Sequence, residues 1–165
     1  MKVKSPDREE VATAIRALLT KQIDFDAFKS RLGTLVPRDP LELEVFEAKF
    51  LHASNPALAI EKLMATFRRA QRRKRVRTAV GCLSELQLLY SRTGQHDLAV
   101  RTCRRIVRWK PTVDALLFLA GAEEQVGNLQ ASKRAYVRIL QRRDSQRETV
   151  AFAKDEIARL DAKAL

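Results

Sequence analysis

The side chains in this sequence that could do chemistry are two histidines, two cysteines and one dense run of arginines. His52 and His96 each lie near an expected turn. Cys82 and Cys103 form neither a CxxC pair nor a Cys/His cluster of the kind that binds zinc. The sequence has no GxSxG, GxxxxGK[ST] or HExxH motif. We therefore expect no catalytic residue, no metal site and no cofactor, and a protein that is not an enzyme.

The arginine run is the segment FRRAQRRKRVR, residues 67–77, which holds seven basic side chains and no acid. It contributes more than half of the formal net charge of +12, which comes from 32 Lys and Arg against 20 Asp and Glu. Such a charge favours association with RNA, DNA, anionic lipid or an acidic protein. In a eukaryotic host the run would also fit a nuclear address. No Gly or Pro lies between Pro56 and Gly81, so we expect one long helix that displays the run to solvent.

Length and composition predict one globular domain. The chain has 165 residues, of which 45% are hydrophobic and 32% charged. No stretch approaches the roughly 20 apolar residues that span a bilayer, and the N-terminus lacks the apolar run of a signal peptide. These features predict a cytoplasmic protein with reduced thiols and no membrane insertion. They leave its oligomeric state open.

The elements that must position these residues are all expected to be helices. No segment alternates apolar and polar residues over the length of a strand. Helix-breaking and capping residues instead divide the chain into about nine helices joined by short loops. The expected breaks are VPRDP (36–40), Ser54 to Pro56, RTGQHD (92–97), KPTVD (110–114), QVGN (125–128) and RRDSQ (142–146).

Part of the chain is repeated. Residues 83–111 align with residues 116–144 without a gap, and residues 43–71 form a weaker third copy. Small residues recur near the start of the second helix of each copy, where they let two helices approach closely. They are Ala59, Ala99 and Ser132. Two copies carry a glycine, Gly94 or Gly127, in the turn before that helix.

This pattern resembles the tetratricopeptide repeat, a helical hairpin of 34 residues. The resemblance implies an all-α, right-handed superhelical stack of hairpins flanked by helices at both ends. Within a single domain, 1–165, it implies an N-terminal helical pair (1–36), repeats at 40–73, 80–111 and 113–144, and a C-terminal capping helix (145–165). Some positions depart from the pattern, since Glu47 and Gln87 replace small residues and Glu123 replaces an aromatic. An unrelated helical bundle and the RNA-binding pentatricopeptide repeat remain alternatives.

In the family, the first helices of the hairpins line a concave groove that binds peptides. By repeat position, the resemblance places the following residues in this groove: Leu41, Glu44, Ala48, Leu51, Ser84, Leu88, Ser91, Leu117, Phe118 and Gly121. Some of the leucines could instead pack against the N-terminal helices. The carboxylate clamp of the co-chaperone members is not expected, because the positions of its Lys, Asn and Arg residues hold Glu44, Ala48, Asp114 and Phe118.

The second helices would present a basic surface on the convex side. Its expected members are Arg68, Arg72, Arg73, Arg75, Arg101, Arg104, Arg105, Arg108, Arg138 and Arg142, with Lys133 and Arg134 beside them. The combined prediction is an adaptor, scaffold or chaperone that binds a protein or peptide in its groove and an anionic partner on its basic face. A nucleic-acid-associated subunit and a chaperone of type III secretion translocators are the alternatives.

Overall fold

The computed structural model describes residues 27, 30 and 40–163, and every regular element of residues 40–163 is an α-helix. The helices are α3 (Pro40–Ser54), α4 (Pro56–Arg72), α5 (Val76–Arg92), α6 (His96–Trp109), α7 (Val113–Gln125), α8 (Leu129–Leu140) and α9 (Arg147–Lys163). The all-α prediction is confirmed for this part of the chain. The expected helical pair of residues 1–36 lies outside the described residues, apart from residues 27 and 30. None of the helices described is both long and apolar enough to cross a membrane.

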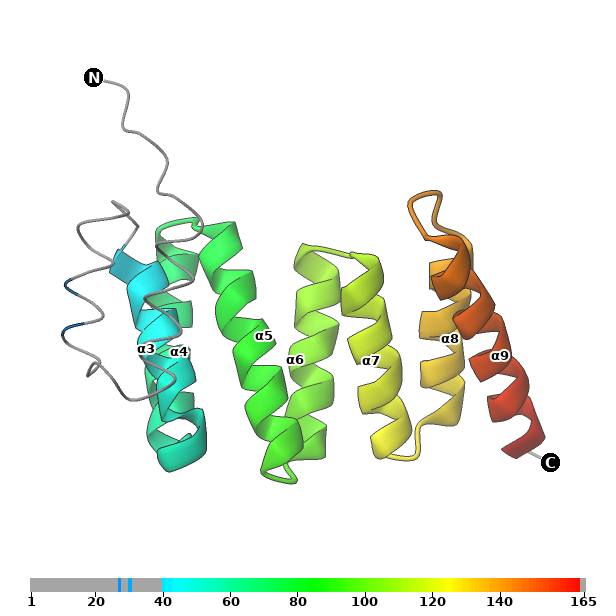
Figure 1. Cartoon of the computed structure of the whole chain (residues 1–165), viewed down its shortest axis with the longest axis horizontal. Coiled ribbons are helices and arrows are strands. Elements are labelled where there is room, and N and C mark those ends of the chain that lie inside the picture. The colour runs from blue at the N-terminus through cyan, green and yellow to red at the C-terminus, as the bar shows by residue number, and fades with distance from the viewer. Residues whose placement is uncertain (1–26, 28–29, 31–39, 164–165) are drawn as a thin grey trace, which may run out of the picture.

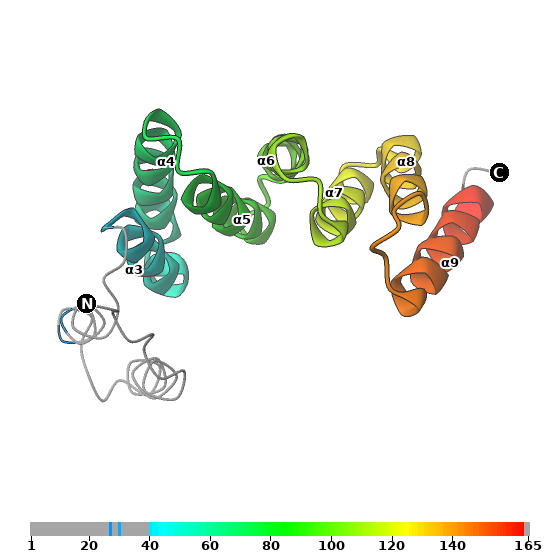
Figure 2. The ribbon, with the colours of Figure 1, turned by 90° about the horizontal axis from the view of Figure 1, so that it is seen from above.

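The helices stand side by side in one row and alternate in direction along it (Figure 1). Seen from above, the row zigzags between two layers, with α4, α6 and α8 in one and α3, α5, α7 and α9 in the other (Figure 2). Each helix packs against the next one in the sequence, and α3 also packs against α5. We call the layer of α4, α6 and α8 the second-helix layer, and the layer of α3, α5, α7 and α9 the first-helix layer. Each layer forms one face of the protein.

Tight turns join α5 to α6 and α7 to α8. In each turn a glycine takes a left-handed conformation, with φ of 73° at Gly94 and 75° at Gly127. The backbone N–H three residues after the end of each helix then donates to a carbonyl of its last turn. Gln95 N donates to Tyr90 O and Asn128 N donates to Glu123 O, each over 2.8 Å. The glycines therefore end these helices, as the sequence predicts.

The arginine run does not form one helix, and that prediction is wrong. Helix α4 ends at Arg72, Lys74 takes a left-handed conformation with φ of 55°, and α5 begins at Val76. Arg75 N donates to Ala70 O over 2.8 Å, which repeats the hydrogen bond of the two glycine turns. A non-glycine residue in this conformation costs about 1–2 kcal/mol. Packing of α5 back onto α4 outweighs that cost, because a continuous helix would leave the apolar face of α5 in water.

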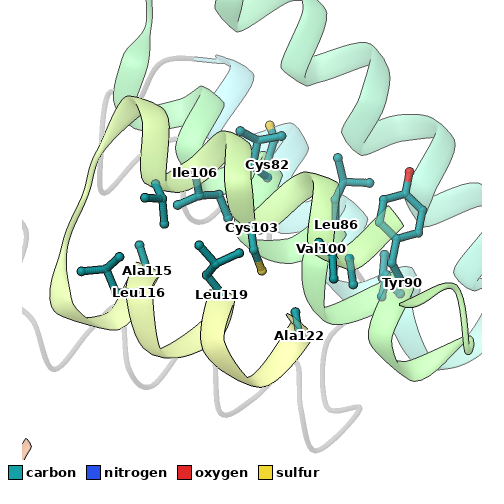
Figure 3. Close-up of a cluster of buried hydrophobic side chains, with 14 of the residues drawn as sticks. Cys82, Leu86, Tyr90, Val100, Cys103, Ile106, Ala115, Leu116, Leu119 and Ala122 are labelled. Atoms are coloured by element: carbon teal, nitrogen blue, oxygen red, sulfur yellow. The ribbon is translucent and has the colours of Figure 1, made fainter. Parts of the chain in front are cut away.

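The core lies between the two layers and runs along the whole row. Leu86, Ala99, Leu119 and Tyr136 are all buried. In the middle of the row, side chains of α5 meet those of α6 and α7 (Figure 3). Ala99 is fully buried close to the turn between α5 and α6. A small side chain at this position allows the two helices to approach closely.

The last helix, α9, closes the row on the side of α8 (Figure 1). Ala153 and Leu160 are buried, Ile157 packs against the core, and the ring of Phe152 lies 6.1 Å from that of Tyr136 between centroids. Charged contacts fix it to α7. Arg159 donates two hydrogen bonds to the carboxylate of Glu124, over 2.7 and 2.6 Å, and Lys163 donates a third over 2.9 Å. The helix expected after Asp144 is therefore present and is held partly by ion pairs.

Candidate functional site

A groove opens in the first-helix layer between α5 and α7. From residue 40 to residue 163, α5 packs closely against α3, α4 and α6 but not against α7. The resulting pocket has a volume of about 280 Å³. Its lining residues are Val80, Ser84, Gln87 and Leu88 of α5, Asp114, Ala115 and Phe118 of α7, and Ile106, Lys110 and Thr112 between them. We call this pocket the α5–α7 groove.

The walls of the α5–α7 groove are mainly apolar. Leu88 is 39% exposed and Phe118 is 50% exposed, which is high for such large apolar side chains. Ser84 and Ala115 are small and leave space between the two helices. The hydroxyl of Ser84 is already satisfied, because Oγ donates to the carbonyl of Val80 over 3.1 Å. The groove therefore offers van der Waals contact rather than catalytic groups.

Charged groups lie at one end of the groove, where α6 connects to α7. Lys110 and Asp114 are exposed and line the pocket. Neither makes an ion pair within the described part of the chain. Thr112 caps α7, with its hydroxyl oxygen accepting from Ala115 N over 3.2 Å. A bound chain could thus place polar groups at this end and apolar side chains along the walls.

Two of the expected groove residues do not line a groove, which corrects the prediction. Leu41 is 2% exposed and Ala48 is fully buried. Helix α3 packs on both α4 and α5, so its inward face is covered. Leu41 and Ala48 are therefore core residues rather than groove residues.

The other expected groove residues are divided among several places. Ser84, Leu88 and Phe118 meet in the α5–α7 groove. Ser91, Leu117 and Gly121 are partly exposed on the same two helices but do not line the pocket. Leu51 packs against the core. Glu44 turns toward α4, where its carboxylate accepts hydrogen bonds from Thr66 Oγ1 over 2.7 Å and from Arg69.

Several groove residues were missed by sequence reasoning. Val80 lies four residues before Ser84, so helical spacing alone could have identified it. Ala115 is related to Phe118 by three residues in the same way. Lys110 and Thr112 belong to the connection between α6 and α7, and a pattern based on first helices carries no signal for them.

The second-helix layer carries arginines on its outer side. The buried stripes of α4, α6 and α8 contact the first-helix layer, so their opposite stripes face away from it. Six exposed arginines lie on these outer stripes and make no ion pair within the described residues. They are Arg68 and Arg72 of α4, Arg101 and Arg108 of α6, and Arg134 and Arg138 of α8. We call these six residues the arginine face.

Three other arginines of the expected basic surface have structural partners. Arg104 forms a bidentate pair with Glu123, over 2.7 and 3.0 Å. The guanidinium of Arg105 lies 4.3 Å from the ring centroid of Phe67. Arg142 pairs with Asp144 over 2.8 Å and also donates to the carbonyl of Pro111. The remaining two, Arg73 and Arg75, are exposed in the turn between α4 and α5.

The two cysteines lie in the interior, and His52 is partly buried. Cys82 and Cys103 are free thiols that are fully buried, and burial raises the pKa of each to about 12. At neutral pH both are therefore protonated and poorly nucleophilic. Burial also lowers the pKa of His52, whose Nε2 lies 3.8 Å from Oε2 of Glu85. Among the residues described, no group of three or more His, Cys, Asp or Glu side chains could hold a metal ion.

Comparison of the sequence with models of known protein families gives no match, and comparison with curated proteins gives none. The functional assignment therefore rests on the groove, the arginine face and the arrangement of the helices.

Proposed function

We propose that α3–α4, α5–α6 and α7–α8 are three hairpins of the tetratricopeptide type, stacked with a right-handed twist and closed by α9. The matching turns at Gly94 and Gly127 support this proposal. So do the small buried residues Ala59, Ala99 and Ser132, which occupy equivalent positions in α4, α6 and α8. A stack of this kind binds partners along its surface, because each repeat contacts only its neighbours and leaves both faces open.

On this fold we infer a non-enzymatic scaffold or chaperone that binds a segment of a partner protein in the α5–α7 groove. One observation carries the inference. Leu88 and Phe118 belong to different hairpins, yet both expose large apolar surface to the same pocket. Apolar walls with charged groups at one end suit an extended or helical peptide.

The buried thiols with a pKa of about 12 offer no nucleophile, which supports a binding role. They also suit a reducing compartment such as the cytoplasm.

Peptide selection followed by matched variants tests the groove. Peptides are first selected from a random library on the wild-type protein. We expect the double variant Leu88→Ala, Phe118→Ala to bind them at least about tenfold more weakly, since burying each side chain contributes about 1.5–3 kcal/mol. The control is Leu98→Ala, Phe152→Ala, which removes the same two side-chain types from exposed positions outside the groove.

Salt separates this mode of binding from a charged one. Binding in the groove should change little between low and high salt, because apolar contacts release no counterions. Equal binding of the selected peptides to the groove variant, its control and the wild type would refute the proposal.

A further inference from the structure

The positive charge of the chain is concentrated in one part of it. Residues 62–113 hold 14 Lys and Arg but only two acids, Glu85 and Asp97. The rest of the sequence has equal numbers of the two kinds, so this part accounts for the whole excess of +12. Glu85 lies on α5, in the first-helix layer, where it pairs with Lys49 over 3.0 Å. It therefore does not neutralise the arginine face, whereas Asp97 lies exposed in the first turn of α6, four residues before Arg101.

The arginines of α4, α6 and α8 belong to one continuous surface. Arg105 links α6 to α4, since it lies over Phe67 and donates to Gln71 over 3.4 Å. Between α6 and α8, Arg104, Arg134 and Arg138 line a single pocket of about 320 Å³. The carboxylate of Glu123 in that pocket is already paired with Arg104. Arg134 and Arg138 thus remain available to an anion from outside.

Helix stabilisation accounts for only some of these residues. Cations in the last turn of a helix interact favourably with its C-terminal carbonyl groups. Arg72, Arg108 and Arg138 lie in the last turns of α4, α6 and α8. Arg68, Arg101 and Arg134 lie outside those last turns, are exposed and make no ion pair within the described residues. The dipole effect gives no reason for an arginine at these three positions.

The composition of the surface favours phosphate over an acidic protein. Protein interfaces usually have an apolar centre with aromatic or other large anchors. On the arginine face no large hydrophobic residue is exposed among the six arginines, and the exposed Leu58 and Leu98 lie near the starts of α4 and α6. On α4, α6 and α8 both lysines, Lys62 and Lys133, are held in ion pairs, so every exposed basic residue without an ion pair is an arginine. The planar guanidinium of arginine binds phosphate with two hydrogen bonds at once.

The absence of an aromatic platform on the arginine face favours a duplex over a single strand. Single-strand binders usually stack bases on exposed aromatic rings. Trp109, at the end of α6, is partly buried and packs against Phe67, with 5.9 Å between ring centroids. The surface extends over three helices, so it can follow a row of phosphates. We infer that the arginine face binds the phosphate backbone of double-stranded nucleic acid without reading its bases.

A matched pair of triple variants tests this inference on the full chain. Arg68→Gln, Arg101→Gln, Arg134→Gln removes one arginine from each second helix and leaves the last turns unchanged. The control, Arg92→Gln, Arg147→Gln, Lys154→Gln, removes the same charge from exposed positions on α5 and α9. Binding is measured by fluorescence anisotropy with short labelled RNA and DNA duplexes over a salt series, and thermal melting confirms that both variants fold.

We expect the arginine-face variant to lose at least about tenfold in affinity, and its salt dependence to decrease by about two to three in logarithmic slope. The control should stay within about twofold of the wild type. A preference for one duplex would identify RNA or DNA as the source of the phosphates. Equal losses in the two variants would overturn the inference, because net charge alone would then explain binding.

Other polyanions distinguish a duplex from alternative partners. Single-stranded RNA, polyglutamate and phosphatidylserine vesicles are measured under the same conditions. Weaker binding of all three supports the inference. Tighter binding of polyglutamate would instead assign the face to an acidic protein, tighter binding of vesicles to a membrane surface, and tighter binding of the single strand to unpaired nucleic acid.

The inference is independent of the groove proposed above. The variant Leu88→Ala, Phe118→Ala leaves the second-helix layer unchanged, so we expect it to bind duplexes as the wild type does. Loss of duplex binding in that variant would contradict the separation of the two sites.

Discussion

Lys74 occupies the backbone conformation that Gly94 and Gly127 occupy in the other two tight turns. A side chain in this conformation strains the backbone by about 1–2 kcal/mol, and glycine relieves that strain. Part of the gain in stability is offset, because glycine loses more conformational entropy on folding. We therefore expect Lys74→Gly to raise the free energy of unfolding by about 0.5–1 kcal/mol. Urea denaturation measures the change.

Two further variants separate backbone strain from charge in that prediction. Lys74→Ala removes the same positive charge but keeps a Cβ atom, so it should give little or none of the gain. Gly94→Ala should lose about 1 kcal/mol. A Cβ atom built at Gly94 would meet nothing within 4 Å, so this loss would come from the backbone conformation alone. An equal gain from Lys74→Gly and Lys74→Ala would show that charge repulsion, not strain, destabilises the turn.

At the scale of the elements, the attachment of α9 should depend on pH through Glu124. Hydrogen bonds from Arg159 and Lys163 lower the pKa of Glu124 to about 2, from an ordinary value of 4.5. A carboxyl group whose pKa is lowered in the folded state stabilises that state at pH values above the pKa that the group has in the unfolded chain. The contribution is lost as the pH falls toward 2. Glu124→Gln should therefore lower the free energy of unfolding at neutral pH, by no more than about 1 kcal/mol because the pair is partly exposed.

Urea unfolding over a pH series checks this prediction. The difference between wild type and Glu124→Gln should be constant above about pH 5 and should disappear toward pH 2. Glu61→Gln serves as the control, since Glu61 is exposed and makes no ion pair within the described residues. A difference that persists unchanged at pH 2 would show that packing of the side chain, rather than its charge, fixes α9.

Most helix boundaries could be predicted because local residues determine them. Asn55 caps α4 by accepting from Leu58 N over 3.1 Å, Pro56 follows it, and glycines end α5 and α7. The turn at Lys74 could not be predicted in this way, since lysine does not favour it locally. A longer-range signal exists. Ala79 follows Lys74 by five residues, as Ala99 follows Gly94, and both alanines are fully buried.

The candidate groove was predicted only in part for a related reason. Ser84, Leu88 and Phe118 could be found from repeat positions, because α5 and α7 follow the repeat pattern. Leu41 and Ala48 could not be excluded, because their burial depends on how α3 packs against α4 and α5. The arginine face follows directly from helical periodicity. The sequence carries no signal for which arginine pairs with Glu123 or lies over Phe67, because these contacts form between helices.

At the scale of the whole molecule, the two cysteines report on opening of the core. Cys82 and Cys103 lie on adjacent helices in the middle of the row, fully buried (Figure 3). Because each has a pKa of about 12, reaction with iodoacetamide at neutral pH requires exposure of the thiol. We expect both to stay unmodified in the native protein and to react together through the urea transition. Mass spectrometry of the labelled protein measures this.

Rapid labelling of one thiol in the native state would contradict that expectation. If only Cys103 reacted, α6 would have to detach from its neighbours without unfolding of the rest. A disulfide between the two cysteines would likewise contradict the reduced state expected from the sequence.

The order in which the helices pack has a consequence for the speed of folding. Among helices α3 to α9, every closely packed pair except α3 with α5 consists of helices adjacent in the sequence. Such contacts close short loops, which cost little entropy, and chains with low contact order reach the native state quickly. Any hairpin of the row can therefore serve as a nucleus, from which structure spreads to neighbouring helices in either direction. A chain emerging from the ribosome could begin this process before its C-terminal helices had been synthesised.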